Sequence, residues 1–154
     1  MQFTTLSIFT TLTALAAARD SFWHVTDMQA NCRDEATSQE CFYLFNIHGA
    51  KDGKLPGFEA QCRTQSLPGD RNKRTCYIQP GHADQVVQEV SAYLKFDPRH
   101  DNTEDNELYV ELKFTSGDSN EVQTWQANRI TTYDNFVTTK DFDLIPTYHY
   151  GTKK

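Results

Sequence analysis

The stretch ELYVELKFTSGDSNEVQTWQANRITT (107–132) decides the fold class of this chain. Apolar and polar side chains alternate without a break over its first part, ELYVELKF (107–114). This period of two is typical of a strand with one buried and one solvated face. The polar turn SGDSN (116–120) follows, and residues 121–132 return as a partner strand. The stretch therefore predicts a β-hairpin whose inward residues are Leu108, Val110, Leu112 and Phe114.

Similar patterns recur earlier in the chain, bounded by Gly, Pro, Asn and Asp. We expect strands over FWHVTDMQA (22–30), CFYLFNIH (41–48) and FEAQCRT (58–64). The second of these is apolar on both faces at its start, which favours a central, buried strand. The third alternates, and it predicts that Phe58, Ala60 and Cys62 face the core.

Two further segments complete the strand pattern. Residues 85–96, QVVQEVSAYLKF, fit either a strand or a helical stripe, and we assign them to a strand because their neighbours are all strands. A last pair of short strands is expected in 136–150, interrupted by Pro146. Many short strands with turn signals between them indicate an all-β fold, a single-domain antiparallel β-barrel or sandwich.

Length and composition narrow the class of protein. The chain has 154 residues, a length typical of one domain, and 12% of them are aromatic, which a disordered chain lacks. Its net charge of −6 argues against nucleic-acid binding, because that function needs a basic face. No stretch after residue 20 is apolar enough to span a bilayer. We therefore expect a folded domain that binds neither nucleic acid nor membrane.

The first eighteen residues, MQFTTLSIFTTLTALAAA, have the features of a secretory leader. They carry no charged side chain, include an apolar stretch, and end in the small-x-small pattern that signal peptidase accepts. We expect a signal peptide over residues 1–18 and one secreted, extracellular domain over residues 19–154.

Secretion favours disulfides for the four cysteines, with three possible connectivities. Each of two pairs, Cys32 with Cys41 and Cys62 with Cys76, encloses a polar segment that resembles the tip between paired strands. We therefore favour these two bonds, each stabilising the fold by about 3 kcal/mol in the chain-entropy model. Neither spacing fits a zinc site.

Catalytic and metal-binding motifs do not emerge from the sequence. It contains no G-x-S-x-G elbow, no H-E-x-x-H and no phosphate-binding glycine motif. Glu107 and Glu111 share a strand face that we expect to be solvated. The acidic loop DPRHDNTEDNE (97–107) could hold calcium, but it does not fit the EF-hand pattern, and a solvated tip is the simpler interpretation. We expect no cofactor and no metal ligand, including among the scattered histidines His24, His48, His82, His100 and His149.

Positive charge gathers in and beside the proposed Cys62–Cys76 loop. The interpretation stays open between a solvated turn and a contact patch for an acidic partner. Lys73-Arg74 is also a dibasic pair of the kind that secretory processing proteases cut, although the disulfide would retain the nicked fragment. The candidate patch consists of Arg63, Arg71, Lys73 and Arg74.

Residues 22–96 resemble a known family. The leader is followed by Trp23-His24-Val25, then by the aromatic strand 42–47, and then by Phe58 leading through Cys62 and a polar loop to Cys76. In this order the motifs are similar to those of the fungal secreted β-barrel family typified by the major Alternaria allergen.

The resemblance implies an antiparallel β-barrel, secretion and no established enzymatic activity. Members of that family act as effectors or elicitors that meet host defence proteins, and some are allergens. Cys62 and Cys76 match the family's disulfide, and Trp23 matches its first-strand aromatic. The chain departs from the pattern in two ways: it has no C-terminal disulfide, and no unpaired N-terminal cysteine for a covalent dimer.

The leading functional hypothesis is a secreted, non-catalytic effector or allergen-like protein that acts by surface contacts with host extracellular proteins. One alternative is a small secreted ribonuclease of the fungal guanine-specific type, and another is a barrel that carries a small ligand in an apolar pocket. The ribonuclease hypothesis would use Glu89, Glu111, Arg129 and His149 as acid–base candidates.

Overall fold

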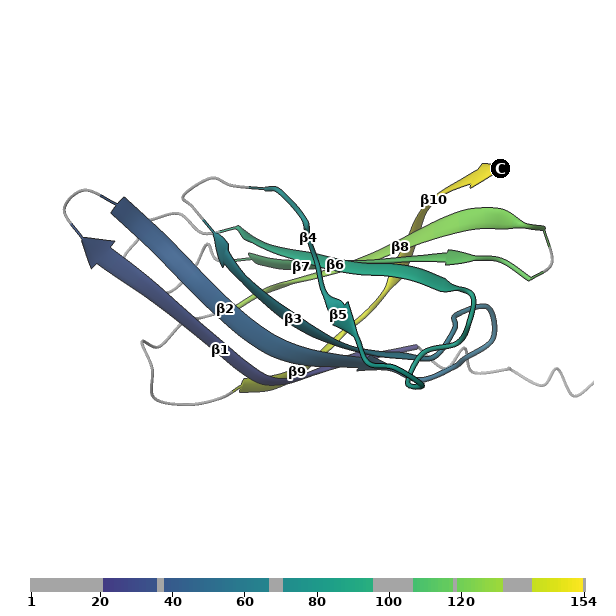
Figure 1. The fold of residues 1–154 in the computed structure, drawn as a ribbon, viewed down its shortest axis with the longest axis horizontal. Helices are drawn as coiled ribbons and strands as arrows, with labels where there is room; N and C mark the ends of the chain where they lie inside the picture. Colours follow the sequence, from purple (N-terminus) through teal and green to yellow (C-terminus); the bar gives the residue numbers. More distant parts are fainter. Residues whose placement is uncertain are drawn as a thin grey trace, which may run out of the picture.

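Two antiparallel five-stranded sheets make up the fold in the computed structural model (Figure 1). The structure describes residues 21–35, 38–66, 71–95, 107–117, 119–131 and 140–153. The first sheet has the strand order β5-β3-β2-β1-β9, and the second has the order β10-β8-β7-β6-β4. The strands are β1 (Trp23–Glu35), β2 (Ser38–Gly49), β3 (Phe58–Ser66), β4 (Arg74–Thr75), β5 (Tyr77–Ile78), β6 (Val87–Lys95), β7 (Glu107–Thr115), β8 (Glu121–Ile130), β9 (Lys140–Leu144) and β10 (Thr147–Lys153).

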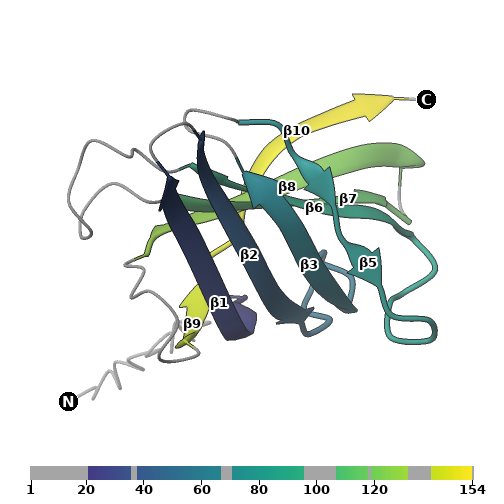
Figure 2. The ribbon, with the colours of Figure 1, turned by 60° about the vertical axis from the view of Figure 1, so that its left-hand side comes forward.

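The two sheets lie face to face as a sandwich, with the strands of one crossing those of the other (Figure 2). The sequence left barrel and sandwich open, and the structure decides for the sandwich. The closed barrel that the family resemblance implied is therefore wrong for this chain. Each sheet keeps two edge strands: β5 and β9 border the first sheet, and β10 and β4 border the second.

The hairpin predicted from residues 107–132 is confirmed. β7 pairs antiparallel with β8 in one uninterrupted register, from Glu107 opposite Ile130 to Thr115 opposite Val122. The inward residues were also predicted correctly, since none is more than 2% exposed: Leu108, Val110, Leu112 and Phe114.

The earlier strands follow the sequence pattern as well. β2 lies between β1 and β3, as its apolar start predicted. The inward set predicted on β3, namely Phe58, Ala60 and Cys62, is fully buried. Residues 85–86 form a turn, and the ambiguous segment continues as the strand β6, which confirms the strand assignment.

The two C-terminal strands, β9 and β10, flank Pro146 as expected, but they do not pair with each other. β9 pairs with β1 in the first sheet, and β10 pairs with β8 in the second. The chain therefore changes sheet at Ile145-Pro146, where the backbone without an amide hydrogen cannot continue a ladder.

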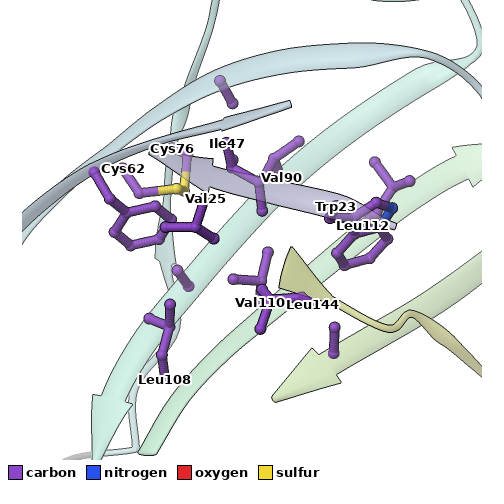
Figure 3. Close-up of a cluster of buried hydrophobic side chains, with 14 of the residues drawn as sticks. Trp23, Val25, Ile47, Cys62, Cys76, Val90, Leu108, Val110, Leu112 and Leu144 are labelled. Carbon is purple, nitrogen blue, oxygen red and sulfur yellow. A yellow bond between two sulfur atoms is a disulfide. The ribbon is translucent and has the colours of Figure 1, made fainter. Parts of the chain in front are cut away.

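The space between the sheets is filled by one apolar core (Figure 3). Trp23 of β1 and Phe58 of β3 pack edge to face, with ring centroids 5.5 Å apart. Aliphatic side chains of β6 and β7 meet them from the other sheet, among them Val90 and Leu112, and Leu144 of the neighbouring strand β9 joins the same core.

A second change of sheet occurs at Cys76. β4 pairs with β6 of the second sheet, Cys76 follows, and β5 pairs with β3 of the first sheet. The Cys76 amide donates to the Val90 carbonyl at 2.8 Å, so the crossover residue is hydrogen-bonded to β6. We call residues 71–78 the crossover segment.

The predicted disulfide between Cys62 and Cys76 is present, with a Cα–Cα distance of 4.4 Å. The segment that it encloses joins the antiparallel pair β3 and β5, as predicted, but it also contains β4, which belongs to the other sheet. The bond fixes the crossover segment to β3, inside the core.

The other predicted bond, Cys32–Cys41, joins two residues whose side chains the structure does not describe. The β1–β2 register sets Cys32 directly opposite Cys41, so the backbone is compatible with it, and the bond stays a prediction. The predicted signal peptide (1–18) and residues 97–106 of the acidic loop also lie outside the described residues.

Replacing both Cys62 and Cys76 by Ser is expected to lower the free energy of unfolding by about 3 kcal/mol, because the closed loop no longer restricts the unfolded chain. Urea unfolding followed by tryptophan fluorescence measures the change. Lys54→Ala, at an exposed position outside the crossover segment, serves as control and should stay within about 0.5 kcal/mol of the parent. Equal urea midpoints for the double variant and the parent would contradict the role assigned to this bond.

Candidate functional site

The outer face of the second sheet, which points away from the core, carries a depression of about 200 Å³. It lies over the neighbouring strands β6, β7 and β8, beside the crossover segment. We call it the outer depression; its lining residues are Lys73, Ser91, Tyr93, Tyr109, Val110, Glu111 and Gln126.

Strand register explains why these residues meet. Ser91 of β6 is opposite Glu111 of β7, and Glu111 is opposite Gln126 of β8. One row further along, Tyr93 is opposite Tyr109. Because side chains alternate across a sheet, residues two apart on one strand share this outer face.

Glu111 is the central side chain of the depression, and it is only 2% exposed. The expectation that it lies on a solvated surface is therefore wrong. It accepts hydrogen bonds from Lys73 Nζ and from Gln126 Nε2, the latter at 2.7 Å. Lys113 Nζ lies 3.4 Å from its other carboxylate oxygen. Neighbouring side chains on a closed sheet surface thus bury this carboxylate.

Burial by itself raises the pKa of the Glu111 carboxyl, because it disfavours the charged form. The hydrogen bonds from Lys73 and Gln126 and the charges of both lysines outweigh burial. The pKa of Glu111 therefore lies below its usual range, and the group is an ionised carboxylate at neutral pH.

The neighbouring row continues the ion pairs. Lys113 donates to Glu89 at 3.0 Å, and this bond holds the pKa of Lys113 above its usual value despite partial burial. Lys113 thereby bridges Glu89 and Glu111. Alternating charges thus form one continuous row, which consists of Lys73, Glu111, Lys113 and Glu89. We call this row the ion-pair network.

Tyr93 and Tyr109 form a parallel stack beside the ion-pair network, with ring centroids 4.5 Å apart and planes 7° from parallel. The Tyr109 hydroxyl donates to Glu107. Burial raises the pKa of both phenols, and the Glu107 carboxylate adds to this shift while Arg71 opposes it. Both side chains are therefore neutral phenols at physiological pH.

Ser91 forms the floor between these groups, and it is 1% exposed. Its hydroxyl has no hydrogen-bond partner in the structure. Buried polar groups are paired in the great majority of cases, because leaving one unpaired costs about 1–3 kcal/mol. A ligand hydroxyl that reached this atom would supply the missing hydrogen bond.

The sequence contained only part of this site. Glu111 and Lys73 were singled out, but Tyr109, Ser91 and Gln126 were not. The only signal for them was the β6–β7–β8 register, which the sequence does not give. Once Ser91 is aligned with Glu111 and Gln126, the row is evident.

The four cations of the predicted contact patch are divided between surfaces. Lys73 reaches Glu111, and Arg71 acts on both stacked tyrosines, so these two border the outer depression. Arg74 is opposite Ala92 and is exposed at the edge strand β4. Arg63 alternates with the buried Cys62 and is exposed on the outer face of the first sheet.

The four ribonuclease candidates do not converge on one site either. Glu89 and Glu111 share Lys113 on the outer face. Arg129 is the cross-strand partner of the buried Leu108, so its side chain lies on the core side of the sheet. There it donates to the Asp143 carbonyl at 3.2 Å, and its guanidinium lies over the Phe142 ring. His149 sits on β10, two strands away from β7.

The histidines that the structure describes are surface groups. His24 lies 2.5 Å from Asp143, and His82 lies 2.7 Å from Glu59, in exposed pairs. No group of three or more metal-ligating side chains occurs among the described residues, and His100 lies outside them. In that same part of the chain, no helix is long and apolar enough to cross a membrane.

Comparison with protein-family models, with curated proteins and with solved structures found no match to this chain.

Glu111→Gln is expected to lower the free energy of unfolding by about 2 kcal/mol at neutral pH, because it leaves two lysines without their shared carboxylate. The folded-state pKa of Glu111 lies below that of the unfolded chain, so its stabilisation is complete above about pH 4.5 and is lost as the pH falls through the lowered pKa. The gap between parent and variant should therefore narrow in acid. Urea unfolding from neutral pH to about pH 3 measures it.

Glu89→Gln is the matched control, since this carboxylate is more exposed and contacts only one of the two lysines in the ion-pair network. Its effect at neutral pH should stay below about 1 kcal/mol. A Glu111→Gln deficit that is the same at every pH would contradict the ionised, lysine-paired carboxylate.

Proposed function

We propose that the protein is a secreted, non-catalytic binding protein of the effector or allergen-like kind, which acts through surface contacts with extracellular host proteins. The leader pattern over residues 1–18 supports secretion. The resemblance of residues 22–96 to fungal secreted effectors supports the class.

The single observation that carries the binding role is the pairing of the buried Glu111 carboxylate with Lys73, Lys113 and Gln126. A general acid or base works best with a pKa near the operating pH, which enzymes reach by burying a carboxyl without a cation. Glu111 is held in the opposite condition, since Lys73 and Lys113 lower its pKa. Such a carboxylate is a fixed hydrogen-bond acceptor, which suits recognition.

Arg129 lies on the opposite side of the sheet from Glu89 and Glu111, which also weighs against the ribonuclease alternative, because acid–base partners must all lie within hydrogen-bond reach of the substrate. An assay of RNA digestion by the purified mature chain tests that alternative directly. Cleavage that Glu111→Gln abolishes would replace the present proposal.

The contact surface we propose is the second sheet's outer face with its basic border, Arg71, Lys73 and Arg74. The border lies in the crossover segment and includes part of the edge strand β4. Cations at the rim of an interface mainly increase the association rate and select partners of opposite charge. The partner surface is therefore acidic where it meets this border.

Arg71→Glu combined with Arg74→Glu is expected to weaken binding of an extracellular host protein by about 10-fold, because it puts like charges opposite the acidic surface. The immobilised mature chain (residues 19–154) is cross-linked to partners in host extracellular fluid, and the affinity of the identified partner is then measured. Raising the salt concentration should weaken the parent complex and leave the variant less affected.

Lys54→Glu combined with Arg63→Glu is the control, since it makes the same change in net charge at exposed positions outside the border. It should alter the affinity by no more than about two-fold. If the mature protein captures no extracellular protein and elicits no host response, the proposed function is lost.

A further inference from the structure

The unpaired Ser91 hydroxyl indicates that the outer depression is built for a ligand. It lies in the floor of the depression at 1% exposure, without a partner. Around it are an ionised carboxylate of Glu111, the Lys73 ammonium and the Gln126 amide. A group that both donates and accepts hydrogen bonds could satisfy the hydroxyl and join this network.

Charge balance decides which ligand chemistry fits. Two lysines and two carboxylates alternate in the ion-pair network, and Arg71 and Glu107 add one charge of each sign beside it. A phosphate or carboxylate ligand would meet Lys73 only by competing with Glu111, whose own charge repels it. Neutral hydroxyls can donate to the carboxylate and accept from the ammonium without breaking the existing pairs.

The tyrosine stack supplies the second half of the recognition. Tyr93 and Tyr109 both line the depression and are partly exposed, so apolar ring surface lies next to the polar network. Tyrosine combines an apolar body with a hydrogen-bonding hydroxyl. A sugar ring has the complementary form, with a C–H face and a rim of hydroxyls.

Size limits how much of a ligand enters. The depression has a volume of about 200 Å³, which is the volume that roughly seven water molecules occupy in the liquid. A complete small-molecule pocket is larger, at ~300–1,000 Å³. One monosaccharide ring fits this space, with the rest of the chain outside. We propose that the outer depression binds one ring of a neutral glycan, through Ser91, Glu111 and the Tyr93–Tyr109 stack. This inference rests on the proposed function and names the chemistry by which the extracellular partner is recognised.

The test measures binding of defined oligosaccharides to the mature chain by calorimetry. The neutral probes are hexamers of glucose, xylose, mannose and N-acetylglucosamine; the anionic probes are oligogalacturonate, a heparin fragment and inorganic phosphate. Binding of at least one neutral hexamer, tighter than every anionic probe, is the expected result. Failure of all four neutral hexamers to bind, or tighter binding of an anionic probe, overturns the inference.

Ser91→Ala locates the site without endangering the fold. Removing a buried hydroxyl that has no partner leaves no group unsatisfied, so the urea midpoint should not fall. Affinity for the neutral hexamer should fall about 5-fold, the value of one hydrogen bond. Unchanged affinity in this variant overturns the assignment of the site.

Tyr93→Leu is expected to reduce the same affinity by about 10-fold, through loss of the aromatic surface. Tyr77→Leu is its matched control, because Tyr77 is an exposed tyrosine on β5 of the other sheet and should leave the affinity unchanged. Equal losses in the two variants would point away from the outer depression.

The inference and the proposed function fail in different ways. If a captured host protein binds equally well after enzymatic removal of its glycans, the sugar site is wrong and protein-contact function stands. If no host protein is captured at all, the proposed function is wrong whatever the oligosaccharides do.

Discussion

The Cys62–Cys76 bond is the constraint on which the rest of this structure depends. It ties the buried inner face of β3 to the residue at which the chain leaves the second sheet for the first. Lys73 precedes Cys76 by three residues, and it ends over Glu111 on the outer face of β7. A covalent bond inside the core thus positions a cation on the surface. The candidate site is a consequence of how the sandwich is closed along one side.

Much of this architecture could be predicted from the sequence, and the reason is periodicity. Where one face of a strand is buried, a shift of one residue would expose every apolar side chain, so the pattern fixes which residues face inward. Leu108 to Phe114 and Phe58 to Cys62 were predictable on this basis. The Cys62–Cys76 pairing was also predictable, because the segment between the two cysteines joins two strands, β3 and β5, that pair with each other.

Relations between strands far apart in the chain were not predictable. The sequence of β4 and β5, separated by Cys76 alone, contains no sign that the two belong to different sheets. β9 and β10 make the same change of sheet around Pro146 on the other side of the sandwich. The burial of Glu111 was not predictable for the same reason. Alternation placed its side chain on the outer face, but only its neighbours Lys73, Ser91 and Gln126 show that this position is buried.

The outer face is also where the structure departs from what stability alone favours. A buried ion pair repays its desolvation only with good geometry, and well-packed apolar residues of similar volume often serve stability as well or better. Here a carboxylate at 2% exposure lies beside a hydroxyl at 1% exposure that has no partner. Both lie on the outer side of a sheet whose inner side already carries a complete apolar core. Sequences depart from local folding rules mainly at functional sites, and the buried, lysine-paired carboxylate of Glu111 beside the unpartnered Ser91 hydroxyl therefore favours a site made to recognise a polar ligand.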